Sequence, residues 1–216
     1  MELERLLQWM EPSLDTAFAP PPFDSTIAAE FLPVAGRSEA SHRALLQRWN
    51  GFYALNGLLH VFGACNAPPN HSIRVWNAPD GWRRSWGRLT EGLTFFGESA
   101  FGDQFAYRGG KIVRFKSLEG GIDALQATID EWLEACLLDP EFMLHQRVYD
   151  ACAAVHGPVP YGGHFAPTGQ IKSIRDLTPQ TVHVVPSRDS MELKSVAASN
   201  VVSRSTSQIM RAPIRK

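Results

Sequence analysis

Histidine and cysteine are the residue types that first suggest chemistry in this 216-residue chain, which has 7 histidines and 3 cysteines. Cys152 and His156 stand four residues apart, so both would lie on one face of a helix and suit the same zinc ion. His145 stands one turn before Tyr149, and His164 follows a glycine loop. No second Cys/His pair has ligand spacing, and no HExxH motif occurs. We therefore expect no metal site.

Two carboxylates, Glu98 and Asp103, flank a glycine-bearing segment and could converge for general acid–base work. An Asp after Gly in a turn usually accepts hydrogen bonds from nearby backbone N–H groups, and we favour that interpretation of Asp103. The segment GESAFGD lacks the lysine and the helix start of a phosphate loop. No GxSxG or cysteine-nucleophile signature occurs. We expect a non-catalytic protein without a cofactor; the alternative is an unrecognised hydrolase or nucleotide-binding enzyme centred on Glu98 and Asp103.

A tryptophan- and arginine-rich segment is the feature closest to a nucleic-acid site: Trp76, Trp82, Arg83, Arg84, Trp86 and Arg88. Such residues can stack on single-stranded nucleic acid, or they can form a core lid with arginines packed over tryptophan. The formal net charge of −1 gives no overall attraction to nucleic acid or to a membrane. We therefore interpret the segment as a lid and expect neither partner.

Charge is segregated along the chain. Residues 117–146 carry seven acids and no Lys or Arg, whereas eight bases against three acids follow from Lys172 to the end. The acids could form a solvated helical face or attract the basic block within the fold. The sharper hypothesis is an acidic face that recognises a basic protein partner, because complementary charge raises the on-rate and the specificity of association. Its predicted contacts are Glu119, Asp123, Asp130, Glu131 and Glu134.

The composition, 44% hydrophobic and 20% charged, is that of a globular domain with appendages. No apolar run reaches the about 18 residues of a membrane helix. The acidic N-terminus does not resemble a signal peptide. An odd number of cysteines without a CxxC pair favours the cytoplasm, and Cys136 and Cys152 suit buried packing. We expect an N-terminal helix and proline linker over residues 1–23, one domain over 24–200 and a basic tail over 201–216.

The expected elements position these residues. Leu93–Phe115 predicts a β-meander, because three aromatic and β-branched runs are separated by glycine-bearing breaks. Its Phe95, Phe105, Tyr107 and Phe115 are expected on the packing face of the sheet. We expect helices at 25–31, 38–49, 122–136, 139–156 and 187–199, and strands at 58–63, 73–76 and 181–185. Residues 157–169 read as loop.

Taken in order, several landmarks resemble the SMI1/KNR4 family, also called the SUKH superfamily. Leu32–Pro33 precedes a helix that ends in Trp49–Asn50–Gly51; the aromatic strand with Phe95 follows, then Gly102–Asp103–Gln104–Phe105–Ala106–Tyr107, then the helix with Trp132. The resemblance covers residues 30–140. The interval before Asn50 is longer than expected, with Gly36–Arg37–Ser38 inserted, and residues beyond 157 extend past the matched part.

The resemblance implies an α+β fold with a central, mostly antiparallel sheet and helices packed against it. It also implies a non-catalytic binding role. Bacterial members are often cytoplasmic immunity proteins that bind and neutralise a cognate toxin, frequently a nuclease, and others are regulatory adaptors. No catalytic residues carry over. We therefore expect an immunity protein whose partner is a toxin domain with a basic surface; the alternative is a scaffold or adaptor that docks through its basic tail or proline linker.

Overall fold

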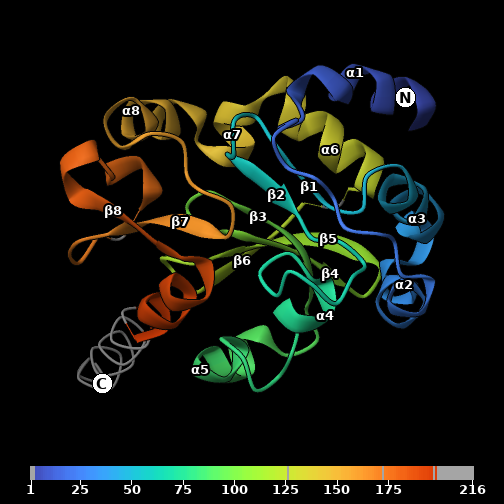
Figure 1. Ribbon diagram of the computed structural model, residues 1–216. Coiled ribbons are helices and arrows are strands. Elements are labelled where there is room, and N and C mark those ends of the chain that lie inside the picture. The colour runs from blue at the N-terminus through green and yellow to red at the C-terminus, as the bar shows by residue number, and fades with distance from the viewer. Residues whose placement is uncertain (1–2, 126, 172, 197, 199–216) are drawn as a thin grey trace, which may run out of the picture.

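A six-stranded antiparallel sheet forms the centre of the protein (Figure 1). The computed structural model describes residues 3–125, 127–171, 173–196 and 198. The strands lie side by side in chain order: β1 (Phe52–Ala54), β2 (Leu59–Val61), β3 (Thr94–Ser99), β4 (Gln104–Arg108), β5 (Lys111–Lys116) and β6 (Gly121–Ala124). The predicted meander and the α+β fold class are therefore confirmed.

The tight turn between β4 and β5 shows why the sequence forms a meander. Arg108 pairs with Lys111, so only Gly109 and Gly110 connect the strands. Their φ angles are 57° and 76°, which glycine adopts at little cost and which matches the right-handed twist of a hairpin.

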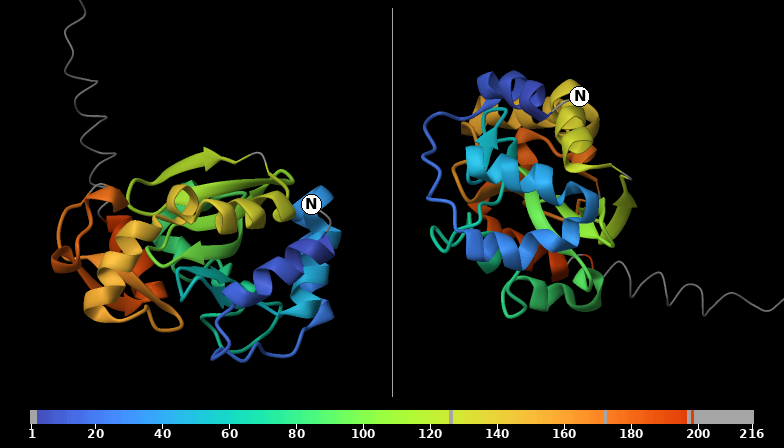
Figure 2. Two further views of the ribbon diagram at one scale, coloured as in Figure 1. Left: turned by 90° about the horizontal axis from the view of Figure 1, so that it is seen from above. Right: turned by 90° about the vertical axis from the view of Figure 1, so that its right-hand side faces the viewer.

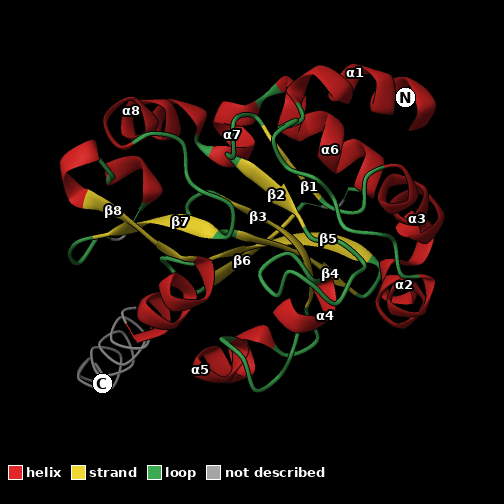
Figure 3. Ribbon diagram, viewed as in Figure 1, coloured by secondary structure: helices red, strands yellow, loops and turns green. Residues whose placement is uncertain are grey.

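Helices cover both faces of the sheet (Figure 3). Their bounds are α1 (Leu3–Met10), α2 (Ser25–Phe31), α3 (Glu39–Arg48), α4 (Ile73–Trp76), α5 (Arg83–Trp86), α6 (Ile129–Leu138), α7 (Pro140–Leu144) and α8 (Gln146–His156). On the α6 face, Trp132 packs against Phe105 with ring centroids 5.0 Å apart. On the α5 face, Trp86 packs against Phe115 at 4.8 Å.

The predicted aromatic packing face is in fact two faces. Phe95 and Phe115 point toward α5, whereas Phe105 and Tyr107 point toward α6, because side chains alternate along each strand. The predicted tryptophan lid is confirmed: the three tryptophans are at most 4% exposed. The guanidinium of Arg83 lies 5.4 Å from the centroid of the Phe95 ring.

A second, two-stranded sheet lies at the opposite end of the molecule from the N-terminal helices (Figure 2). It consists of β7 (Gly163–Pro167) and β8 (Val182–Pro186). The predicted strand at 181–185 is confirmed, but the loop predicted over 157–169 contains β7. Residues 187–196 and 198 are helical, as expected. The predicted cap Asn200 and the basic tail lie outside the described residues.

Three local predictions are wrong. Ile73–Trp76 is a helix, because the Ser72 side chain caps the N–H of Val75. Residues 121–124 pair with β5 as a strand, so the following helix begins at Ile129. The helix predicted from Asp139 to His156 breaks at His145, whose φ of 61° is left-handed.

The N-terminal segment packs onto the same core. Leu6, Leu7 and Met10 of α1 are at most 6% exposed within the main hydrophobic cluster. The side-chain amide of Asn50 donates to the carbonyl oxygens of Pro21 and Pro22, at 3.1 and 2.8 Å. The proline segment is therefore tied to the end of α3. Of the described helices, none is long and apolar enough to cross a membrane.

Candidate functional site

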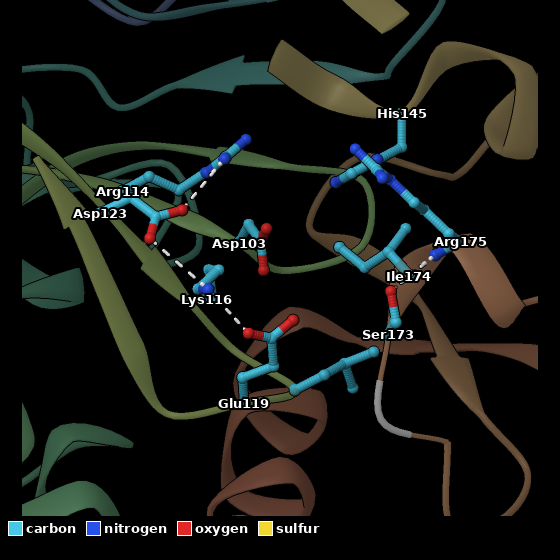
Figure 4. Close-up of a pocket in the computed structure, with 10 residues that line it drawn as sticks. Asp103, Arg114, Lys116, Glu119, Asp123, His145, Ser173, Ile174 and Arg175 are labelled. Atoms are coloured by element: carbon cyan, nitrogen blue, oxygen red, sulfur yellow. Dashed lines mark hydrogen bonds and ion pairs between the residues drawn. The ribbon is translucent and has the colours of Figure 1, made fainter. Parts of the chain in front are cut away.

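A charged cavity of about 230 Å³ opens between β5, the α7–α8 corner and the segment around residue 174 (Figure 4). We call it the charged cavity. Its lining combines bases and acids from separate parts of the chain: Asp103, Arg114, Lys116, Leu118, Glu119, Asp123, His145, Ser173, Ile174 and Arg175. Four charged residues of this lining come from one hairpin: Arg114 and Lys116 on β5, Glu119 in the turn and Asp123 on β6. The short β5–β6 turn brings them together.

Those four residues neutralise each other. Arg114 lies 3.1 Å from the carboxylate of Asp123, and Lys116 lies 2.7 Å from Glu119 and 3.5 Å from Asp123. The hydrogen bond with Glu119 is the main cause of the raised pKa of Lys116. Two of the five acids predicted to contact a partner, Glu119 and Asp123, are therefore engaged within the fold.

The other wall of the cavity holds basic groups without acidic partners. In Figure 4, Arg175 and His145 lie across the cavity from Lys116. Among the described residues, the Arg175 guanidinium and the His145 ring form no hydrogen bond or ion pair. Burial, followed by the charges of Arg114 and Arg175, lowers the pKa of His145, and the weaker effects of Glu141 and Glu119 oppose this. The neutral form of His145 is therefore favoured, and Arg175 carries the positive charge of this wall.

The remaining predicted acids lie on α6. The Glu131 carboxylate accepts hydrogen bonds from the backbone N–H and the hydroxyl of Thr128, completing a capping box that lowers the pKa of Glu131. Glu134 and Asp130 are half-buried. The five acids thus form two groups, one within the charged cavity and one on α6, instead of a single acidic face.

An apolar pair stands at the corner where α6 meets α7. Leu138 and Phe142 are 66% and 59% exposed. Asp139 lies between them and caps α7 by accepting a hydrogen bond from the N–H of Phe142 at 3.0 Å. Glu134 stands one turn earlier on α6, and Glu141 directly precedes Phe142. We call Glu134, Leu138, Asp139, Glu141 and Phe142 the corner patch.

A buried polar row crosses the α5 face of the sheet. Tyr53, His60, Glu98 and Gln104 are successive cross-strand partners on β1, β2, β3 and β4. All four are at most 5% exposed. The Glu98 carboxylate lies 3.0 Å from His60 Nδ1, and it accepts a hydrogen bond from Gln104 at 2.9 Å. His164 Nε2 of β7 is 3.1 Å from its second oxygen.

Proton counting assigns charges in this row. His71 Nε2 donates to the Asn50 carbonyl oxygen, and His71 Nδ1 lies 2.8 Å from His60 Nε2. His60 Nδ1 then faces the Glu98 carboxylate. These three contacts need three protons, but two neutral imidazoles supply only two. The hydrogen-bonded row of His71, His60 and Glu98 therefore holds one proton more than two neutral imidazoles supply.

The extra proton resides on His60. Burial holds the pKa of His71 down at about 3, so His71 is neutral. Burial alone would raise the pKa of Glu98, but His164 and then His60 outweigh it and the pKa falls below its ordinary value. Glu98 is thus a carboxylate paired with a His60 imidazolium, sealed in the core.

Asp103 and Glu98 have different hydrogen-bond partners. Its carboxylate accepts a hydrogen bond from the Ser117 N–H at 2.9 Å, 14 residues away, so the predicted bonding within its own turn is wrong. Burial raises the pKa of Asp103. Asp103 lines the charged cavity, and Glu98 does not.

The family landmarks lie mostly in the core. Leu32, Phe95, Phe105, Tyr107 and Trp132 are at most 2% exposed, and Pro33 and Trp49 lie at the ends of the neighbouring helices. Gly51 has a φ of 74°, and a Cβ there would stand 2.3 Å from His71 Nε2. Gly102 likewise leaves room for His164 and Lys194.

The sequence reasoning missed His60 as a partner of Glu98 and His71 as a partner of His60. A period-two pattern through Leu58–Gly63 places His60 on one face, but only the strand register shows that Glu98 lies opposite. Of the suggested zinc pair, Cys152 is fully buried, and His156 contacts the Pro179 carbonyl oxygen at 2.7 Å. Within the described residues, no cluster of three or more His, Cys, Asp or Glu side chains is arranged to hold a metal ion.

Comparisons with known proteins bear on the fold. No family model matches the sequence, and no curated protein matches it. Among solved structures, the chain is similar to the crystal structure of Atu4351 from Agrobacterium tumefaciens. The TM-score is 0.54 at 11% sequence identity, and the match covers 82% of each chain. At this identity the similarity concerns the fold alone, and the relation to the SMI1/KNR4 family stays a prediction.

Proposed function

We propose that this chain is a non-catalytic protein-binding module of the immunity type, which binds and neutralises a bacterial toxin domain with a basic surface. The corner patch is the observation that carries this proposal. Two large apolar side chains, Leu138 and Phe142, are more than half exposed and are flanked by acids. Exposed apolar groups with a polar rim are typical of protein interfaces.

The chemistry of the patch favours a basic partner. Glu134, Asp139 and Glu141 are the acids nearest the apolar pair in the chain. Glu141 is paired with Arg147 at 3.1 Å, so part of its charge is offset within the fold. Asp130 and Glu131 lie further back along α6. A nuclease groove carries the opposite charge, because it must attract phosphates. Phe142 would anchor the complex and the acids would steer it. Glu119 and Asp123 stay predicted contacts, although binding through them would have to share their ion pairs with Arg114 and Lys116.

The expected cytoplasmic location belongs to the same proposal. Cys65, Cys136 and Cys152 are unpaired and buried, which suits a reducing compartment. A regulatory adaptor is the alternative function, and it would bind a partner that has no toxicity of its own.

The first test compares matched variants in binding. The tagged chain captures its partner from the native cell, and the purified partner is then titrated with Phe142→Ser and Glu134→Lys. We expect Phe142→Ser to weaken binding at least tenfold, about 1.4 kcal/mol, because an interface anchor is lost. Glu134→Lys should slow association and reduce its salt dependence.

Two exposed residues outside the corner patch supply the controls. Leu193 is 59% exposed, the same fraction as Phe142, and Glu91 is an exposed acid before β3. Leu193→Ser and Glu91→Lys should leave both affinity and salt dependence unchanged. Equal binding by Phe142→Ser and Leu193→Ser would refute the corner patch as the interface.

A further inference from the structure

The charged cavity has features that partner binding through the corner patch does not use. It is a concave site of about 230 Å³, large enough for a group of a few heavy atoms. On one wall, the ion pairs among Arg114, Lys116, Glu119 and Asp123 cancel in charge. On the other wall, Arg175 and His145 have no acidic partner among the residues that the structure describes.

Three groups with unused hydrogen-bond donors therefore line the same cavity. Arg175 contributes a planar guanidinium, His145 contributes a ring N–H, and Arg114 contributes a buried Nε without an acceptor in the described structure. A buried donor without an acceptor is destabilising, and an acceptor supplied by a ligand would satisfy it. A ligand that satisfies these donors must offer hydrogen-bond acceptors and a negative charge, so it is an anion.

The acids of the cavity limit the charge of that anion. Asp103, Glu119 and Asp123 line the same space, so a doubly charged phosphate would face three carboxyl groups at close range. A carboxylate carries a single charge, and its two oxygens match the fork of an arginine. We infer that the charged cavity binds the carboxylate group of a small molecule, held by Arg175 and His145. This site uses none of the side chains of the corner patch and needs no protein partner.

Acetate is the probe for this site. A ligand of four heavy atoms such as acetate should bind with a Kd on the order of 1 mM. The readout is the NMR signal of the His145 ring, identified by its loss in His145→Gln, at constant ionic strength with chloride as reference. The charges that face His145 come from β5 (Arg114), the 174–176 turn (Arg175), α7 (Glu141) and the β5–β6 turn (Glu119).

Two exposed arginines give a matched pair of variants. Arg175 lines the cavity, whereas Arg147 is 84% exposed outside it and pairs with Glu141. We expect acetate to shift the His145 signal with saturation in the wild type and in Arg147→Gln. In Arg175→Gln, the Kd for acetate should rise at least tenfold, because one charge-assisted hydrogen-bond donor is lost.

Three results would overturn this inference. The first is a wild-type His145 signal that acetate does not shift, or shifts without saturation. The second is the same Kd for acetate in Arg175→Gln as in the wild type. The third is tighter binding of inorganic phosphate than of acetate, which would exclude a site selective for a single negative charge.

Discussion

At the scale of single residues, the buried pair of His60 and Glu98 is a costly arrangement. Both side chains are 3% exposed, and taking two charges out of water costs several kcal/mol per ion before their attraction offsets it. The pair persists because every neighbour contributes: Gln104 donates to Glu98, and His71 accepts from His60. Removing one partner should therefore cost more than the pair itself contributes.

Replacing Glu98 tests the proton assignment. Glu98→Ala leaves His60, Gln104 and His164 without their acceptor and should cost about 3–5 kcal/mol of unfolding free energy in urea titrations. Glu98→Gln should cost less than half as much, because its amide can donate to a neutral His60 and still accept from Gln104. By ¹⁵N NMR near neutral pH, we expect both His60 nitrogens to be protonated in the wild type and one in Glu98→Gln. A singly protonated wild-type His60 would contradict the assignment.

His42 gives a prediction for acid stability. It is fully buried against Tyr107, and burial lowers its pKa to about 3. Between pH 6.5 and about 3 the unfolded chain binds a proton on His42 that the folded chain does not, so stability falls as the pH drops, by about 1.4 kcal/mol per pH unit.

His42→Gln should reduce that dependence by the same amount while keeping an acceptor for the Tyr107 hydroxyl. The measurement is the free energy of unfolding at several pH values between 4 and 7, for the wild type and the variant. Parallel curves for the two proteins would show that His42 binds its proton over the same pH range in the folded and unfolded states, which would contradict the lowered pKa.

At the scale of elements, glycine positions decide how segments approach each other. Gly51 and Gly157 have similar φ angles of 74° and 80°. A Cβ at Gly51 would stand 2.3 Å from the His71 ring, whereas a Cβ at Gly157 would meet nothing within 4 Å. Alanine at Gly157 therefore adds backbone strain alone, whereas alanine at Gly51 adds both backbone strain and a steric clash.

We expect Gly157→Ala to cost about 1–3 kcal/mol, because its φ of 80° and ψ of 167° lie in a region that essentially only glycine adopts. Gly51→Ala should cost about 1–3 kcal/mol more, because overpacking displaces His71 and with it the polar row. Chemical denaturation of both variants measures the difference. Equal losses would mean that His71 moves aside freely.

The elements also show how far the sequence could predict this fold. The meander followed from the spacing of Phe95, Tyr107 and the Gly109–Gly110 turn, which are local signals. The strand β6 did not, because Ile122 and Leu125 fit a helical stripe equally well and only pairing with β5 decides between them. His60, His71 and Glu98 meet through strand register and a distant loop, which no local pattern reports.

At the scale of the whole molecule, buried chemistry and exposed chemistry are separate. The imidazolium–carboxylate pair is sealed beneath β7 and the C-terminal helix. The corner patch and the charged cavity open to solvent along α6, α7 and their neighbours. Of the predicted acids, Glu119 and Asp123 line the cavity, whereas Asp130, Glu131 and Glu134 lie on α6. Charge reversal on α6 and substitution in the cavity therefore test different functions.

Growth of bacteria that produce the captured partner measures the central claim most directly. The partner's toxic domain is expressed together with the wild-type chain, Phe142→Ser or the matched control Leu193→Ser. The account predicts that the wild type and Leu193→Ser restore growth, and that Phe142→Ser at equal abundance does not. A partner without toxicity, or equal protection by Phe142→Ser, would contradict an immunity function exerted through the corner patch.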